Sequence, residues 1–141
     1  MVATTLVPGR AAGPVLALVQ PLSLWGGVDP TSGVIVEPRH PDHGRCVAGH
    51  ILAMPASRGS SSSSSVLAEL LRRGVGPLGI VLGEPDEILV VGAVVARELY
   101  GVDCPVLLLG RDDYAWIAGW AWMAIDPDGT VTRGAVRPAI S

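Results

Sequence analysis

The sequence has little of several residue types on which common functional sites depend. It contains no lysine and no phenylalanine, and only two cysteines among its 141 residues. Without lysine, this chain can form no lysine Schiff base and has no lysine nucleophile. Cys46 and Cys104 lie far apart and outside any paired motif of the kind that holds zinc or an iron–sulfur cluster. We expect both to be small buried apolar residues, and another chain to supply most ligands of any functional metal.

Charge and hydropathy exclude two classes of partner. The formal net charge is -3, the isoelectric point is about 5.5, and no cluster of basic residues is present, which argues against nucleic acid. No apolar run reaches the roughly 20 residues that cross a bilayer. The first residues also lack the pattern of a secretory signal. We therefore expect a cytoplasmic protein with no membrane partner.

Length and composition predict one domain, residues 1–141, because a hydrophobic content of 49% supplies ample material for a core. Apolar runs separated by glycine turns indicate strands, and apolar residues at helical spacing indicate helices. Asp86 after a proline marks the start of one helix, and Gly101 marks its end. Strands are predicted at 11–18, 33–36, 49–54, 78–82 and 106–109, and helices at 62–73 and 86–100.

The order of these elements predicts an α/β fold with a mixed sheet or barrel-like β half and two main helices. The alternation from residue 49 to 109 indicates at least one parallel strand pair. The first forty residues resemble antiparallel or barrel-forming strands, and Asp126–Gly129 predicts a turn between two short strands. Three tryptophans in residues 111–138 have two interpretations, a contact with a partner or a part of the domain's own core.

Six consecutive serines, residues 60–65, are the most distinctive feature of the chain. On composition alone they resemble a disordered Gly/Ser linker. Their surroundings favour a second interpretation, because an apolar strand precedes them and an amphipathic helix follows. Gly59 and Ser60 would then lie at a helix start, where free backbone N–H groups and the helix dipole favour an anion or an alkoxide.

The remaining polar candidates each have two interpretations. His40 and His43 flank a turn, where most histidines are solvated or bind loop carbonyls and few act as ligands or acids. His50 lies in an apolar strand, where a hydrogen-bonded structural role is expected. Gly26 and Gly27 could line the mouth of a substrate site, yet two glycines are equally what a tight turn requires.

Four separated motifs carry a resemblance to a known family: residues 21–33 (PLSLWGGVDPTSG), 40–44 (HPDHG), 58–61 (RGSS) and 83–93 (GEPDEILVVGA). In this order they resemble the small subunit, or swivel domain, of the aconitase X family. The resemblance implies a hydro-lyase built from this swivelling β/β/α portion and a large portion. It also implies an iron–sulfur cluster on the large partner subunit and none on this chain.

In the wider superfamily, the first serine of a Gly-Ser-Ser motif acts, as an alkoxide, as the catalytic base. That match makes Ser60 the base here. The remaining candidates for substrate binding are Arg58, Gly59, Ser61, Ser62, Gly26 and Gly27. Superfamily members usually carry an arginine directly after the two serines, where this chain has Ser62. Arg58 could instead clamp a carboxylate or phosphate, or be a structural surface residue.

The resemblance implies a small hydroxy acid as substrate, either cis-3-hydroxy-L-proline or mevalonate 5-phosphate. The absence of lysine beside the Gly-Ser motif favours hydroxyproline, with 1-pyrroline-2-carboxylate as the product. Two hypotheses of another class stay open. The chain could be a docking domain without chemistry, or a phosphate carrier, which would require an exposed His40 or His43.

Overall fold

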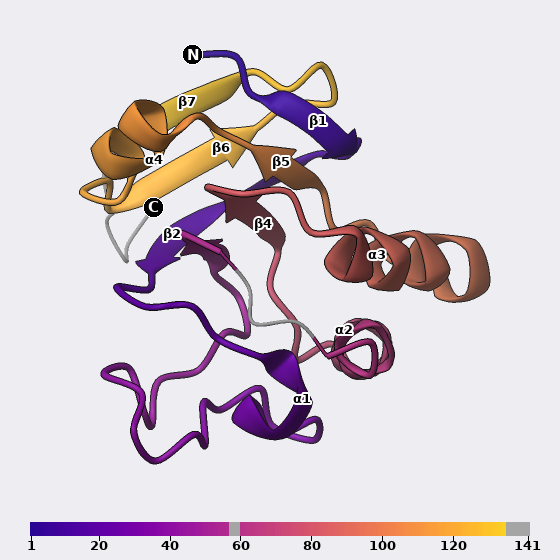
Figure 1. Cartoon of the computed structure of the whole chain (residues 1–141). Coiled ribbons are helices and arrows are strands. Elements are labelled where there is room, and N and C mark those ends of the chain that lie inside the picture. The colour runs from indigo at the N-terminus through magenta and orange to yellow at the C-terminus, as the bar shows by residue number, and fades with distance from the viewer. Residues whose placement is uncertain (57–59, 135–141) are drawn as a thin grey trace, which may run out of the picture.

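A curled, mixed sheet of seven strands forms the centre of this computed structural model, which describes residues 1–56 and 60–134 (Figure 1). The strand order is β1-β5-β4-β3-β2-β6-β7. The strands are β1 (Thr4–Val7), β2 (Ala11–Ala17), β3 (Ile51–Met54), β4 (Gly79–Leu82), β5 (Val106–Leu108), β6 (Trp122–Ile125) and β7 (Val131–Gly134). The helices are α1 (Leu24–Gly27), α2 (Ser63–Arg73), α3 (Glu87–Tyr100) and α4 (Arg111–Ile117).

Strands β2 to β5 pair in parallel, and antiparallel strands flank them on both sides. The N-terminal residues then approach the turn that joins β6 to β7. Ala3 donates its N–H to the Gly129 carbonyl at 2.9 Å, and Val131 donates to the Met1 carbonyl at 2.8 Å. The two ends of the sheet therefore meet, which confirms the predicted barrel-like β half.

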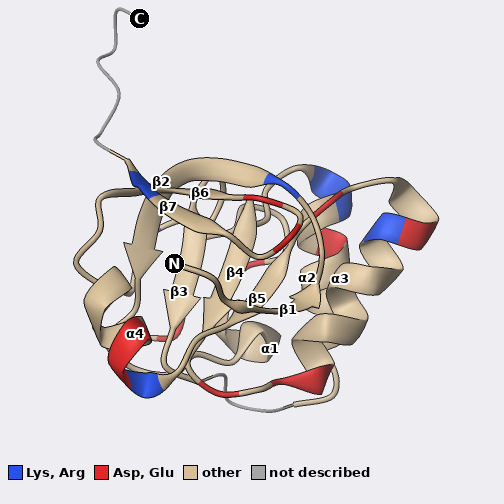
Figure 2. Cartoon of the chain, turned by 90° about the horizontal axis from the view of Figure 1, so that it is seen from above, with Lys and Arg blue, Asp and Glu red and all other residues tan. Residues whose placement is uncertain are grey.

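Alternation along the strands produces a separate core on each face of the sheet, because successive side chains point to opposite faces. In β3, Leu52 and Met54 face the first core, and Ile51 and Ala53 face the second. Helices α2 and α3 pack in the first core, whereas α4 covers the second (Figure 1). Strands β3 and β4 carry no charged residue, as Figure 2 shows.

Capping residues mark both ends of α3 and the C-terminal end of α2. The Asp86 carboxylate accepts hydrogen bonds from the N–H groups of Ile88 and Leu89, and α3 ends at Gly101 with φ 66°. Helix α2 ends at Gly74, whose φ is 74°. Both positions require the left-handed conformation that glycine adopts without strain.

One local prediction was wrong, and short elements were missed. Residues 33–36 form no strand but make isolated bridges from Val34 to Cys46 and from Ile35 to Val28. Gly33 has φ 78° and the segment lies between turns, so a regular ladder cannot continue there. Helix α4 was not predicted, because its seven residues are too few for a clear apolar period.

Candidate active site

The serine tract forms the start of α2. Ser63, Ser64 and Ser65 lie within the helix, and Ser60 to Ser62 form the turn that precedes it. The Ser60 carbonyl accepts the Ser63 N–H at 2.9 Å. The disordered-linker interpretation is therefore wrong for residues 60–65. Two candidates, Arg58 and Gly59, lie outside the described residues.

Ser60, the predicted base, is half-buried immediately before α2. Its Oγ accepts a hydrogen bond from the Ser62 backbone N–H at 3.3 Å. A backbone donor at a helix start stabilises negative charge on the oxygen that accepts from it. The local geometry thus contains a donor of the kind that an alkoxide at Ser60 requires. Ser61 is exposed, and Ser62 is half-buried.

Ser63 joins the serine tract to the loop that contains α1. Its side chain is 3% exposed, and its Oγ accepts the Trp25 backbone N–H at 3.1 Å. The same oxygen lies 3.4 Å from the Ser23 Oγ. The start of α2 and the Ser23–Trp25 backbone are consequently held against each other. Nothing in the sequence pattern distinguishes Ser63 from its five neighbours except its helical spacing from Leu67 and Leu70.

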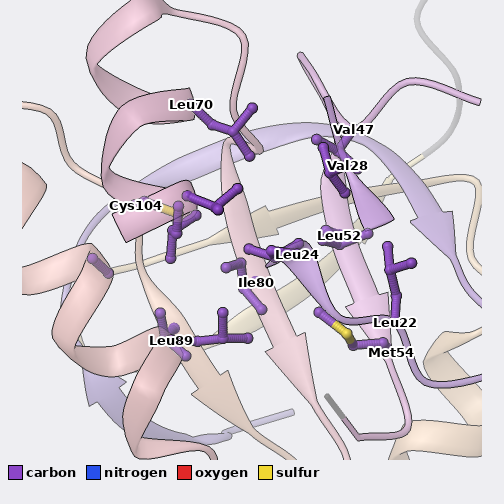
Figure 3. Close-up of a cluster of buried hydrophobic side chains, with 14 of the residues drawn as sticks. Leu22, Leu24, Val28, Val47, Leu52, Met54, Leu70, Ile80, Leu89 and Cys104 are labelled. Atoms are coloured by element: carbon purple, nitrogen blue, oxygen red, sulfur yellow. The ribbon is translucent and has the colours of Figure 1, made fainter. Parts of the chain in front are cut away.

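Gly26 and Gly27 belong to α1, whose interior is irregular. Gly26 has φ 76°, and a Cβ added at Gly27 would lie 3.0 Å from the Leu22 Cδ1 atom. The Gly27 carbonyl accepts the Val36 N–H at 2.8 Å, which fixes the segment that follows. Gly26 therefore occupies a turn conformation that favours glycine, as the tight-turn interpretation expects. Figure 3 shows Leu24 of the same element among the side chains of the first core.

Both glycines also line a cavity of about 380 Å³. The other lining residues come from the loop before α1, from α1 itself and from the loop after it: Gln20, Pro21, Leu22, Ser23, Trp25, Glu37, Arg39 and His40. Sequence reasoning named the two glycines but missed Glu37 and Arg39. Their link to the site depends on the contact between Gly27 and residues 36–37, which no local pattern reveals.

The His40 side chain has a structural role in the wall of this cavity. Its side chain is buried, its Nε2 lies 3.1 Å from the Gln20 carbonyl, and its Nδ1 accepts the Asp42 backbone N–H at 3.0 Å. The Nδ1 atom is thus an acceptor, so Nε2 carries the proton and donates to Gln20. This arrangement ties the loop after α1 to the loop before it. His43 is exposed, and the His50 Nδ1 lies 2.9 Å from the Ala48 carbonyl, in agreement with a structural role.

The cysteines are unsuited to hold a cluster. Cys104 is buried in the first core, and burial raises the pKa of its thiol to about 12. Cys46 is half-buried and donates its Sγ–H to the Ser32 carbonyl at 3.4 Å. Over residues 1–56 and 60–134, no three His, Cys, Asp or Glu side chains come together as a metal site. The residues of this part of the chain do not fit an iron–sulfur cluster.

Two of the three tryptophans of the last third differ in burial, and one of them is part of the domain's own core. Trp120 is buried with Ile117 in the second core, whereas Trp116 is 60% exposed. Their rings meet edge to face, with centroids 5.6 Å apart.

Along the described residues, no helix has both the length and the apolar character needed to cross a membrane.

Comparison with known proteins identifies the family. A model of the aconitase X swivel domain matches residues 1–133. The chain belongs to the aconitase X swivel-domain family. The crystal structure of Thermococcus kodakaraensis aconitase X in its holo-form has the same fold, with a TM-score of 0.80 at 26% identity over 94% of this chain and 96% of that one. The predicted family and fold are both confirmed.

Two curated relatives of the swivel domain differ in length. The cis-3-hydroxy-L-proline dehydratase of Pseudomonas aeruginosa is 46% identical over 122 residues, which cover 86% of this chain and 21% of that protein. The phosphomevalonate dehydratase small subunit of Thermococcus onnurineus is 36% identical over 108 residues, which cover 75% of this chain and 83% of that subunit. The chain thus spans about a fifth of the first relative and most of the second.

Proposed function

We propose that this chain is the small, swivelling part of an aconitase X-type dehydratase and works with a large partner subunit. Residues 1–141 would then act as a single swivel domain. We place the iron–sulfur cluster on the large partner, because the described residues of this chain offer no suitable ligand group. The family match and the separate small subunits among its relatives support this division of roles.

Ser60 is the proposed base, and the observation that carries this role is the Ser62 N–H donated to its Oγ at 3.3 Å. As an alkoxide, Ser60 would remove the proton from the carbon that bears the carboxylate. The electron pair of that C–H bond becomes the new C=C bond as hydroxide leaves the neighbouring carbon. The proton ends on the Ser60 Oγ, and its return to solvent restores the base.

The proposed substrate is cis-3-hydroxy-L-proline, whose enamine product tautomerises to 1-pyrroline-2-carboxylate. The similarity to the hydroxyproline dehydratase supports this choice, since it covers 86% of the chain at 46% identity. Mevalonate 5-phosphate is the second candidate. It is favoured by one observation, namely that the chain matches 83% of a separate phosphomevalonate dehydratase small subunit.

The test is steady-state kinetics of the complex with its large partner on both substrates. We expect Ser60→Ala to lower kcat by at least about a hundredfold, the lower range for the loss of an acid–base group. Ser61→Ala is combined with it, because the neighbouring hydroxyl could substitute in part. Ser65→Ala is the matched control, since that side chain is exposed within α2.

Circular dichroism and partner binding should be unchanged in all variants. Wild-type turnover in the Ser60→Ala, Ser61→Ala double variant would remove both serines from the mechanism and leave a docking domain. Phosphotransfer labelling of the chain would instead indicate a carrier, with His43 as the acceptor. His40 is unsuited to that role, because it is buried and both ring nitrogens are engaged.

A further inference from the structure

The cavity beside α1 contains two opposite charges. Among the residues that line it, Arg39 supplies a guanidinium and Glu37 a carboxylate. His40 uses both ring nitrogens in hydrogen bonds to the backbone. The lining is therefore close to neutral in total but has a separate positive and negative group.

The two charged residues belong to one ordered turn. Glu37 is half-buried, and its Oε1 accepts the Arg39 backbone N–H at 3.1 Å. The Glu37 backbone N–H in turn donates to the Gly27 carbonyl at 3.4 Å. The carboxylate is thus held in place by the turn, whereas the exposed Arg39 side chain has freedom to close on a ligand.

The cavity is also connected to the serine tract. Ser23 and Trp25 line the cavity, and the Trp25 backbone N–H donates a hydrogen bond to Ser63. Ser63 follows Ser60 by three residues in the turn that opens α2. A ligand in the cavity would consequently lie beside the backbone that contacts Ser63, three residues along the chain from the proposed base.

We propose that this cavity binds a zwitterionic amino acid, with Arg39 on its carboxylate and Glu37 on its ammonium group. The choice of a cyclic amino acid as the ligand rests on the proposed function. Arginine pairs with carboxylates through parallel N–H donors, and a carboxylate attracts an ammonium group. A substrate with one carboxylate, one phosphate and no cation would leave Glu37 unpaired and be repelled by it. Glu37 and Arg39 therefore select hydroxyproline over mevalonate 5-phosphate.

The test uses the complex with its large partner and three unreactive probes. L-Proline carries both charged groups, cyclopentanecarboxylate only the anion, and pyrrolidine only the cation. Calorimetry gives the Kd of each probe for wild type, Arg39→Gln and Glu37→Gln. The glutamine at position 37 retains an oxygen for the Arg39 N–H, so the turn is preserved. Arg97→Gln and Glu98→Gln are the matched controls, because those residues form an ion pair of 3.7 Å on α3.

We expect Arg39→Gln to raise the Kd of L-proline and of cyclopentanecarboxylate by about tenfold to a hundredfold, the range for the loss of a hydrogen bond to a charged group. The same variant should leave pyrrolidine unaffected. Glu37→Gln should weaken L-proline and pyrrolidine and spare cyclopentanecarboxylate. The controls should bind all three probes as wild type does.

Two results would overturn the inference: absence of L-proline binding to the wild-type complex, or an L-proline Kd unchanged in both variants. The kinetic outcome is separate. If the wild type turns over hydroxyproline while both variants retain its KM, the proposed function stands and this site is wrong. If L-proline binds with the expected charge dependence but hydroxyproline is not dehydrated, the site stands and the proposed substrate is wrong.

Discussion

An alanine scan of the serine tract tests whether Ser63 fixes the loop that lines the cavity. Ser63→Ala removes the acceptor of the Trp25 N–H, and the loss of such a part-buried hydrogen bond costs about 0.5–1.5 kcal/mol. Alanine recovers up to about 0.5 kcal/mol through its higher helix propensity. The net loss in the free energy of unfolding is therefore at most about 1.5 kcal/mol. Ser65→Ala removes an exposed hydroxyl and should stabilise by up to about 0.5 kcal/mol.

Urea and thermal unfolding of the two variants measure this difference. For a chain of this length, 1 kcal/mol shifts Tm by about 3–4 °C, so the variants, which share the gain in helix propensity, should differ by about 2–5 °C. Ser64→Ala is a further control, since its Oγ donates only to the Ser61 carbonyl at the exposed surface. If Ser63→Ala and Ser65→Ala unfold at the same urea concentration, the hydrogen bond to Trp25 does not hold the loop.

Two further predictions concern packing and thiol reactivity. Gly92→Ala should destabilise the chain by about 1–3 kcal/mol in urea unfolding, because a Cβ there would lie 2.7 Å from the Ser64 carbonyl oxygen, where α3 packs on α2. Val91→Ala on the exposed face of α3 is the control. Equal stability of the two variants would contradict the close approach of the two helices. In the Cys46→Ser variant, a thiol reagent at pH 8 should label Cys104 only after unfolding. Burial raises the pKa of the Cys104 thiol to about 12, so the reactive thiolate becomes appreciable only as the pH approaches that value. Rapid labelling of the folded variant would refute the burial of Cys104.

The sheet and the main helices could be predicted because their signals are local. The helix predicted at 62–73 matches α2 (Ser63–Arg73), whose end Gly74 marks, and the helix at 86–100 matches α3 (Glu87–Tyr100). The four apolar runs that are strands were bounded by glycines or turns. The strand predicted at 33–36 is absent, although apolar and other residues alternate there. The backbone groups of this segment bond mostly to neighbouring turns and not to a continuous partner strand.

The candidate site was only partly predictable. The serine tract and the two glycines are recognisable from the local sequence alone, and the family resemblance names Ser60 as the candidate base. Glu37, Arg39 and Ser63 were missed, since their roles depend on contacts between residues far apart in the chain. The hydrogen bond from Trp25 to Ser63 spans 38 positions, and no periodicity encodes it.

The long excursion between β2 and β3 has a consequence for how this family diversifies. Two neighbouring parallel strands are usually joined through a helix that packs on the sheet, but here residues 18–50 contain only the short α1, turns and isolated bridges. This excursion contributes every residue that lines the cavity and no strand to the sheet. If the cavity is the proposed ligand site, ligand preference can change by substitution in this one connection without any change in the strands of the sheet.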